Sequence, residues 1–169
     1  MSRHFVQYFA RPSAFVICLF AMTRAAAISS GEHDQVVTRI RAVLRTQEAA
    51  WNRGAYLVAT IGRCSDCHTP RNWLGAPEPA RLLAGTSSGP GGKAVPNITP
   101  DSETGIGKWS AEDIVTLLRD GHTPDFDFIG GAMAEIVRNT SRLTDADRRA
   151  IALYLRSLPA IHFRGGAKK

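Results

Sequence analysis

The chain has 169 residues, of which 44% are hydrophobic and 21% are charged, with 21 basic and 15 acidic side chains. This length fits one domain, and the composition is too apolar for a disordered segment and too polar for a protein with several membrane spans. Three cysteines are too few for the disulfide framework of a mini-protein. The net charge of +6 keeps nucleic acid open as a ligand until the basic residues are located.

The first 27 residues have the pattern of a secretory signal peptide. They contain three arginines and no acidic residue, an apolar run over 14–22, and a small-residue site at 25–27. The alternative is an uncleaved membrane anchor, but the run is about half of the ~20 apolar residues that span a bilayer. We therefore predict residues 1–27 as a signal peptide and expect a periplasmic protein, for which peripheral membrane association stays open.

Removal of this leader changes what the charge implies. Residues 28–169 keep 18 basic and 15 acidic side chains, so the net charge falls to +3, and Cys18 is lost. The remaining Lys and Arg residues are scattered, and no expected helix has a one-sided basic stripe with aromatic residues between. We therefore expect no nucleic-acid binding.

Apolar residues at helical spacing begin soon after the leader. They predict an amphipathic helix over 34–49 and a second helical stretch over 54–63, so that the N-terminal extension, residues 28–52, is expected to be helical. The segment 69–108 differs, because it is rich in proline and glycine and fits no long periodic element. A loop of this length in a compact domain is usually functional or wrapped around something.

Two later helices have recognisable start and stop signals. Ser110–Asp113 resembles a capping box, and Gly121 can end the helix that follows. The last helix begins at Thr144–Asp147 and ends at Pro159. Its apolar residues at i, i+3, i+4 and i+7 are Ile151, Tyr154, Leu155 and Leu158. No stretch alternates like a strand, so the predicted fold is all-α, with short helices and a long loop around a core that a large apolar cofactor would complete.

The chemistry lies in one motif, Cys64-Ser65-Asp66-Cys67-His68. C-x-x-C-H is typical of covalent c-type haem attachment. Two thiols three residues apart on one helical turn can reach two vinyl groups on one porphyrin edge, and the next histidine projects its imidazole towards the iron. We therefore expect one covalent haem c on Cys64 and Cys67.

Three alternatives to haem compete for this motif. A thioredoxin-like site would sit beside a βαβ pattern, which is not visible. Zinc needs four ligands, and no second C-x-x-C or H-x₃-H pair completes a tetrahedron. A structural disulfide between the two cysteines is the third alternative. An export signal favours haem, because c-type maturation takes place outside the cytoplasm.

The sixth position of the iron requires a histidine or a methionine. Met133 is the methionine that remains after the leader, and it stands behind Gly130-Gly131, a stretch flexible enough to bring a thioether over a flat ring. A lone methionine more often fills a gap in a core. His122 is the chief competitor, whereas His33 and His162 lie near the chain ends. We predict His68 and Met133 as the axial ligands.

Six stretches in order along residues 53–159 resemble class I-type cytochrome c domains. The most similar are the cytochrome subunits of bacterial periplasmic dehydrogenases, which serve alcohol, aldose or gluconate dehydrogenases and molybdenum hydroxylases. The matching stretches are Arg53–Leu57, Cys64–Arg71, Pro96–Asp101, Thr104–Ser110, Gly131–Glu135 and Leu143–Leu155. The resemblance implies a cytochrome c domain over 53–159 and a tail over 160–169.

The resemblance also implies how this domain would be built. Its first and last helices should cross, with Gly54 or Ala55 allowing close approach to Tyr154. The free ring N–H of the proximal imidazole is usually fixed by an acceptor, for which the Pro70 carbonyl is our candidate. The candidates for contacting the haem propionates are Arg71, Asn97 and Trp109.

The function that the resemblance implies is transfer of single electrons, without enzymatic activity of the chain itself. The donor would be a periplasmic or membrane-associated dehydrogenase, and the acceptor another cytochrome or an oxidase. Many similar subunits contain two or three haem domains, whereas this sequence has a single C-x-x-C-H. Two other functions stay open: a haem enzyme or gas sensor with a labile sixth position, and a thiol–disulfide protein without haem.

Overall fold

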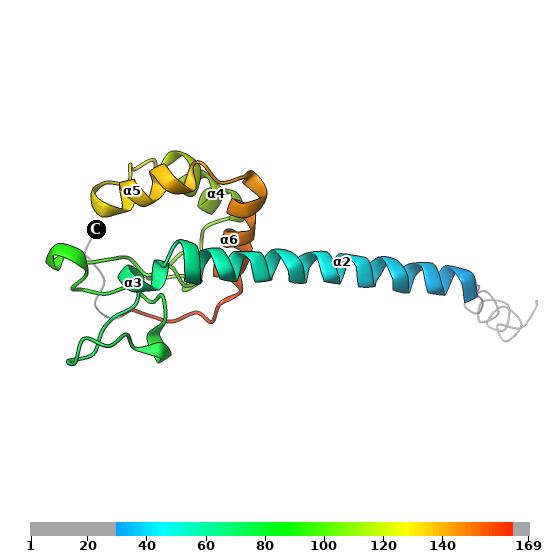
Figure 1. Cartoon of the computed structure of the whole chain (residues 1–169), viewed down its shortest axis with the longest axis horizontal. Coiled ribbons are helices and arrows are strands. Elements are labelled where there is room, and N and C mark those ends of the chain that lie inside the picture. Colours follow the sequence, from blue (N-terminus) through cyan, green and yellow to red (C-terminus); the bar gives the residue numbers. More distant parts are fainter. Residues whose placement is uncertain (1–29, 164–169) are drawn as a thin grey trace, which may run out of the picture. The chain divides into compact units, whose positions relative to one another are not determined.

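The structure is a computed structural model that describes residues 30–163, with side chains from residue 34. The predicted signal peptide and residues 164–169 of the predicted tail lie outside the described residues. The elements in chain order are α2 (Ser30–Tyr56), a π-helical turn η1 (Leu57–Ile61), α3 (Cys64–His68), two 3₁₀ turns, η2 (Pro79–Arg81) and η3 (Pro90–Gly92), and then α4 (Ala111–Asp120), α5 (Gly131–Thr140) and α6 (Asp145–Ser157) (Figure 1).

The all-α prediction is confirmed for the residues that the structure describes. Within 30–163, extended backbone pairs only as three isolated bridges, and no strand forms. None of the helices in this range has the length and apolar character needed to cross a membrane. The chain divides into two units between Val43 and Leu44, and the unit that begins at Leu44 contains every element after α2.

Helix α2 is longer than the sequence pattern indicated. The helices expected over 34–49 and 54–63 are joined, because α2 runs without a break to Tyr56 and passes directly into η1. Residues 49–53 contain no helix breaker, and the helix continues through Gly54. The nearby Ala150 carbonyl leaves no space for a larger side chain at this position. The helical path ends at Gly62, and Arg63 takes a left-handed φ of 45°.

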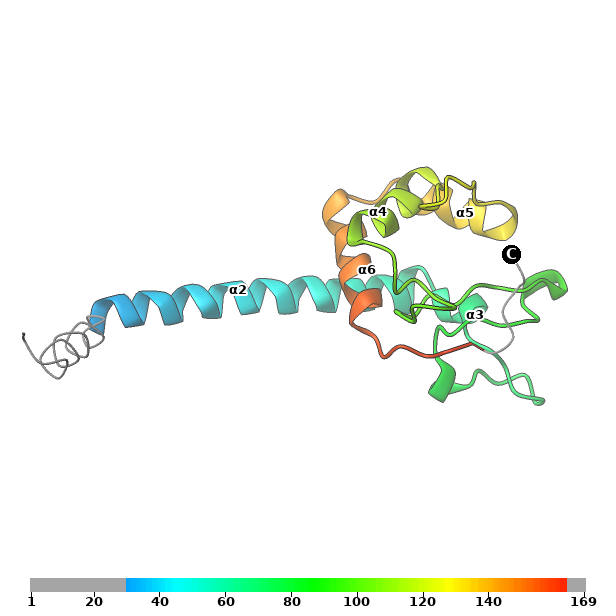
Figure 2. The same ribbon diagram turned by 180° about the vertical axis from the view of Figure 1, so that it is seen from behind.

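The predicted crossing of the first and last helices of the domain is confirmed at Gly54. A Cβ atom on this residue would lie 2.0 Å from the Ala150 carbonyl oxygen and 2.9 Å from the Tyr154 Cβ. The Trp51 ring meets the Tyr154 ring edge-on, with centroids 5.2 Å apart, and its Nε1 donates a hydrogen bond of 2.7 Å to Ser157 Oγ. The C-terminal end of α2 and α6 lie side by side in both Figure 1 and Figure 2.

Helices α4 and α6 supply most of the buried apolar side chains. The Ser110 capping box is present, with Asp113 N–H on Ser110 Oγ and Ser110 N–H on the Asp113 carboxylate. Gly121 ends α4 with a φ of 76°, as predicted, and Thr144 caps α6 by accepting from Asp147 N–H. The buried core consists of Leu57, Val58, Leu83, Ile106, Ile114, Val115, Leu118, Ile151, Ala152 and Leu155.

The proline- and glycine-rich segment is an ordered loop, as the sequence indicated. Its two arms pair through Thr86 and Val95, whose backbone groups exchange hydrogen bonds of 3.0 and 2.8 Å. Gly85 N–H donates to the His68 carbonyl at 2.6 Å, and Ile98 N–H donates to the Leu83 carbonyl at 3.0 Å. These bonds return the chain to the C-x-x-C-H turn.

Candidate functional site

The C-x-x-C-H motif forms a single helical turn, α3. Cys64 and Cys67 are three residues apart on this turn, which places both side chains on the same side. Both are partly buried, and neither forms a disulfide. His68 ends the turn and is 8% exposed. The sequence prediction that these three residues act as one group is therefore consistent with the local geometry.

The His68 ring is held by a backbone carbonyl. Its Nδ1 lies 2.8 Å from the Pro96 oxygen, and because a carbonyl can only accept, Nδ1 carries the hydrogen and Nε2 keeps its lone pair. Burial lowers the pKa of His68, although the hydrogen bond to Pro96 acts in the opposite direction. The result is a neutral imidazole in a fixed orientation, whose Nε2 has a lone pair available to bind a metal.

The prediction that the Pro70 carbonyl accepts the hydrogen bond of the His68 ring is wrong. Pro70 oxygen accepts the Glu78 N–H at 2.9 Å instead, because the chain turns back on itself between the paired residues Arg71 and Pro77. Pro96 reaches His68 because the loop returns after Val95. Sequence reasoning had included Pro96 in a matching stretch but had given it no role.

The Cys64 thiol does not resemble the reactive thiol of a disulfide oxidoreductase. Burial raises the pKa of the Cys64 thiol to about 11, so it is protonated at neutral pH. Reactive cysteines in C-x-x-C oxidoreductases have lowered pKa values instead. No group of three or more His, Cys, Asp or Glu side chains among the described residues could hold a metal ion, which removes support for a zinc site.

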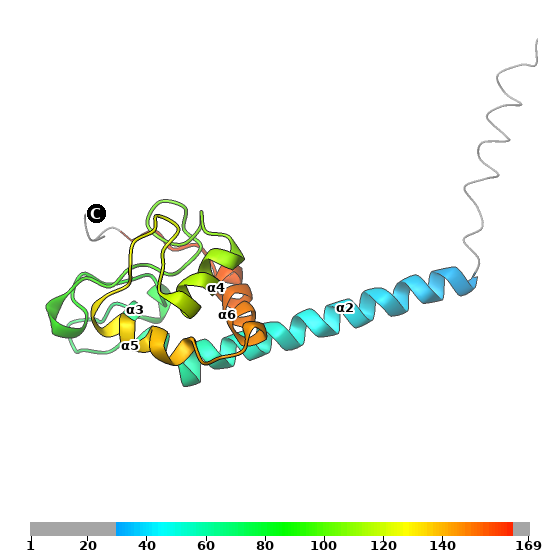
Figure 3. The ribbon, with the colours of Figure 1, turned by 90° about the horizontal axis from the view of Figure 1, so that it is seen from above.

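Met133 lies in the first turn of α5 and is partly buried. In Figure 1 the ribbon of α5 runs above α3, and in the view from above (Figure 3) the two overlap, so α5 faces the C-x-x-C-H turn. Helix α5 buries none of its residues against the described protein. Met133 as an iron ligand stays a prediction.

The other histidines have different surroundings. The His122 ring packs on the Phe128 ring, with centroids 4.3 Å apart. His162 is 47% exposed at its side chain and lies 3.5 Å from the Asp101 carboxylate. The side chain of His33 lies outside the described residues. His122 remains the competitor to Met133.

The three candidates for propionate contacts are placed differently. Both donor hydrogens of the Asn97 amide are used within the protein, on Thr104 Oγ1 at 2.9 Å and on the Ile161 carbonyl at 2.7 Å. Asn97 is also 3% exposed, so the structure favours a role in joining the loop to the C-terminal segment. Arg71 binds the Gly75 carbonyl at 2.9 Å, and Trp109 packs against the core. Their contacts with a haem stay predictions.

The residues present fit a covalently bound haem c. Two unpaired thiols lie on one turn, where they can bind two neighbouring porphyrin substituents, and an imidazole with a free Nε2 follows them as a donor of the type that haem iron takes. The facing helix α5 lacks buried residues of its own, so a large apolar group would complete its packing. Cys64 and Cys67 would hold the porphyrin, and His68 would bind the iron.

Comparison with known proteins agrees with this chemistry. The sequence matches the cytochrome c family profile over residues 52–159. It is 53% identical over 109 residues to a "Diheme cytochrome c-type" protein of Cereibacter sphaeroides. The aligned region covers 64% of this chain and 36% of that protein. It is 44% identical over 116 residues to the "Fructose dehydrogenase cytochrome subunit" of Gluconobacter japonicus, and this aligned region covers 68% of this chain and 23% of the relative.

A third relative is the cytochrome c subunit of "Alcohol dehydrogenase (quinone)" from Gluconobacter oxydans. It is 38% identical over 115 residues, covering 64% of this chain and 24% of that subunit. The chain thus spans roughly a third or less of the length of these curated relatives. The match to the family covers the motif, the long loop and the last three helices, and the chain belongs to the cytochrome c family.

Proposed function

We propose that this chain is an exported, mono-haem c-type cytochrome that passes single electrons from a dehydrogenase to another cytochrome or an oxidase. The observation that carries the proposal is the C-x-x-C-H turn, in which the Pro96 carbonyl fixes the buried His68 with its Nε2 free. The proposed site of action is the periplasm, on the basis of the leader pattern in residues 1–27.

The protein's contribution to this function is to hold and shield a redox centre. A bound haem c would supply an iron that changes oxidation state by one electron. Cys64 and Cys67 would fix its position, His68 would bind the iron, and Pro96 would keep the imidazole in one orientation. Met133, as a soft sulfur donor, would raise the reduction potential relative to two nitrogen ligands. No acid–base pair is required, so we propose no enzymatic role.

The number of haems follows from the number of motifs. The sequence contains one C-x-x-C-H, and we propose one haem per chain. The relative named as a diheme cytochrome is matched over 36% of its length, which is compatible with correspondence to a single haem domain. A one-haem chain cannot relay electrons internally, so donor and acceptor must both approach the same haem.

The proposed donor is a dehydrogenase, because two of the relatives are named as cytochrome subunits of fructose dehydrogenase and of a quinone alcohol dehydrogenase. The proposed acceptor, another cytochrome or an oxidase, rests on the chemistry alone, since a reduced one-electron carrier needs a one-electron acceptor. Which dehydrogenase is served would be decided by reduction of the purified cytochrome with candidate enzymes and their substrates.

The test is to produce the protein in cells competent in haem c maturation and to record its mass and absorption spectrum. We expect one covalent haem per chain and a low-spin, six-coordinate iron that does not bind carbon monoxide readily in the ferrous state. A five-coordinate iron or ready carbon monoxide binding would instead indicate a haem enzyme or gas sensor. A protein without haem would indicate a thiol–disulfide function and overturn the proposal.

Three substitutions test the residue assignments. Met133→Ala should abolish the far-red charge-transfer band typical of ferric haem with a methionine ligand, whereas His122→Ala should leave that band in place. A wild-type spectrum without this band, together with a low-spin iron that His122→Ala makes high-spin, would instead assign the sixth position to His122. Cys67→Ala should prevent two-thioether attachment, and wild-type yield and absorbance from this variant would contradict the proposed motif.

A further inference from the structure

Helix α5, which carries Met133, packs on α4 through a half-buried face. None of its residues is fully buried, and Gly130 at its start offers no side-chain cap. The side-chain hydrogen bonds that tie it to other helices lie at its C-terminal end, near Thr140. A helix fixed at one end transmits any movement of that end to the other, which is the end where Met133 lies.

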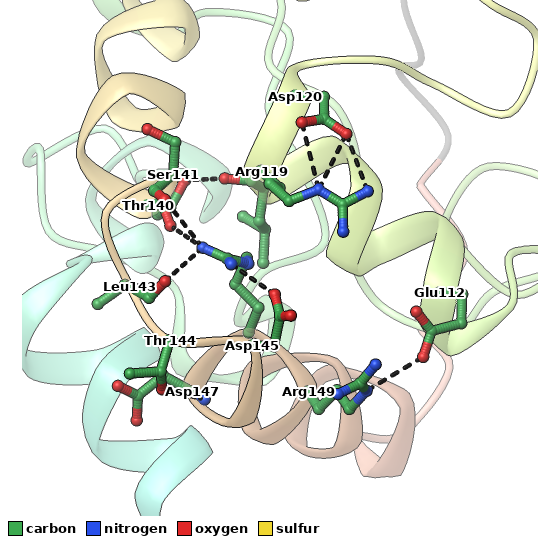
Figure 4. Close-up of polar contacts among 12 residues, drawn as sticks. Glu112, Arg119, Asp120, Thr140, Ser141, Leu143, Thr144, Asp145, Asp147 and Arg149 are labelled. Atoms are coloured by element: carbon green, nitrogen blue, oxygen red, sulfur yellow. Dashed lines mark hydrogen bonds and ion pairs between the residues drawn. The ribbon is translucent and has the colours of Figure 1, made fainter.

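A buried arginine of α6 forms hydrogen bonds with the backbone at that C-terminal end. Arg148 is 5% exposed, and its Nη1 donates to three backbone carbonyls, those of Thr140 at 2.9 Å, Ser141 at 3.1 Å and Leu143 at 2.6 Å. Figure 4 shows these three carbonyls converging on one nitrogen. The Arg148 Nη2 also donates to the Asp145 carboxylate at 2.6 Å. The carbonyls of the last residue of α5, of its C-cap Ser141 and of Leu143 just beyond are thus satisfied by a positive charge, which the negative end of a helix dipole favours.

A second bond joins the same end of α5 to α4. Thr140 Oγ1 donates to the Leu118 carbonyl at 2.6 Å, and Leu118 belongs to the core. Through Thr140 and Arg148, the end of α5 is connected to both α4 and α6. Among the described side chains, Arg148 bonds to the Thr140, Ser141 and Leu143 carbonyls together.

One donor of Arg148 stays unused. Its Nε is buried without a hydrogen-bond partner among the described residues, whereas the other two nitrogens of the guanidinium form four hydrogen bonds. Adjacent Arg149 is exposed and forms an ordinary surface pair with Glu112 at 3.2 Å. Arg148 therefore binds the backbone at the end of α5, whereas Arg149 binds a surface carboxylate of α4. This difference makes Arg149 a matched control.

We propose that Arg148 is a positioning residue that keeps α5 in the place where the Met133 sulfur can bind the iron. This inference rests on the proposed function, because it requires a haem with Met133 as a ligand. Loss of these Arg148 hydrogen bonds would leave the haem covalently attached through Cys64 and Cys67. It would let α5, and Met133 with it, move away from the iron more often.

The experiment compares the ferric holoproteins of wild type, Arg148→Met, Arg148→Lys and the control Arg149→Met. The readouts are the far-red methionine band, the affinity for added imidazole, and amide hydrogen exchange in residues 131–140. We expect Arg148→Met to bind imidazole about tenfold or more tightly, because the state with Met133 released is more populated when charged hydrogen bonds are lost. Exchange in α5 should accelerate in parallel, and Arg149→Met should behave as wild type.

Loss of stability alone has to be distinguished from loss of position. Ile151→Val removes core volume on the same helix without touching the α5 carbonyls, so it should lower stability but leave imidazole affinity unchanged. If Arg148→Met does not yield holoprotein, Arg148→Lys decides, since a lysine keeps the charge but cannot bond all four acceptors in the same way. Unchanged imidazole affinity in the deciding Arg148 variant, or an equal gain in Ile151→Val, would overturn the inference.

Failure of the proposed function would look different from failure of this inference. A wild-type protein without haem, or one whose methionine band survives Met133→Ala, contradicts the function or the ligand before Arg148 is considered. A wild-type protein with a Met133-dependent band, together with an Arg148 variant indistinguishable from it, contradicts the positioning role alone.

Discussion

At the scale of single residues, Gly54 sets how closely α2 and α6 approach. A Cβ at this position would lie 2.0 Å from the Ala150 carbonyl oxygen, a distance that requires the backbone to shift. We therefore expect Gly54→Ala to lower the free energy of unfolding by about 1–3 kcal/mol or more, as overpacking of a tight contact does. Denaturant unfolding of the holoprotein measures this loss.

Gly130→Ala is the matched control for that substitution. A Cβ on Gly130 meets no atom within 4 Å, so its effect should stay within about 0.5 kcal/mol. Equal stabilities for the two alanine variants would show that the α2–α6 contact is looser than the structure indicates.

Residue roles could be predicted where they depend on neighbours in the sequence. The two cysteines and His68 follow from one motif, whereas the close approach at Gly54 or Ala55 was implied by the resemblance to cytochrome c domains. The acceptor for His68 could not be read in this way, because Pro96 is 28 residues away and is brought back by pairing of Thr86 with Val95. Likewise nothing in the sequence near Arg148 indicates that it binds carbonyls at the end of another helix.

At the scale of elements, the start of α6 joins capping to a contact between helices. Thr144 caps the helix, and the Asp147 carboxylate in its first turn accepts from Arg53 Nε on α2 at 2.7 Å. The hydrogen bond to Arg53 is the main cause that lowers the pKa of Asp147 below its ordinary value of 3.8. The ionised carboxylate is thus the form that the folded helix pair favours.

This pairing makes a prediction about pH. Because the folded pKa of Asp147 is lowered, its contribution to stability is fully present above pH 3.8 and is lost as the pH falls through the folded pKa. The holoprotein of Asp147→Asn should be less stable than wild type at neutral pH, and the difference should shrink below pH 3.8. Unfolding free energies measured across this range test it.

The control for the pH prediction is Glu135→Gln. Glu135 pairs with Arg138 on the surface of α5, with both side chains about 70% exposed, and such pairs contribute little. This variant should follow the wild-type pH profile. A difference between wild type and Asp147→Asn that stays constant down to the lowest pH would assign the stabilisation to packing rather than to the charge of Asp147.

Helix ends could be predicted where the signal is local and chemical. Ser110, Thr144 and Gly121 act at the ends of α4 and α6 as their residue types indicate. The break expected after residue 49 did not form, because residues 49–53 contain no helix breaker and α2 continues through Gly54. Apolar spacing marked the two parts of this helix but not the stretch that joins them.

At the scale of the whole molecule, the protein core is divided between side chains and the expected cofactor. The apolar cluster of α4, α6 and η1 is packed by side chains alone, whereas α5 buries none of its residues. Phe126 and Phe128, in the segment between α4 and α5, are 84% and 77% exposed. We therefore expect the haem to act as part of the core for α5 and its preceding loop but not for the α4–α6 pair.

A variant without haem tests this division. The double substitution Cys64→Ala with Cys67→Ala should yield a protein that keeps amide protection in α4 and α6, loses it in residues 131–140, and binds a dye for exposed apolar surface because the phenylalanines stay uncovered. Met133→Ala is the control, since it removes a ligand but keeps the haem attached, so it should retain more protection in α5 and bind less dye. Segment-resolved hydrogen exchange and dye fluorescence measure the outcome. Protection in α5 equal to that of the wild-type holoprotein would mean that side chains alone hold this helix, and that the haem stabilises the fold no more in this half of the domain than in the other.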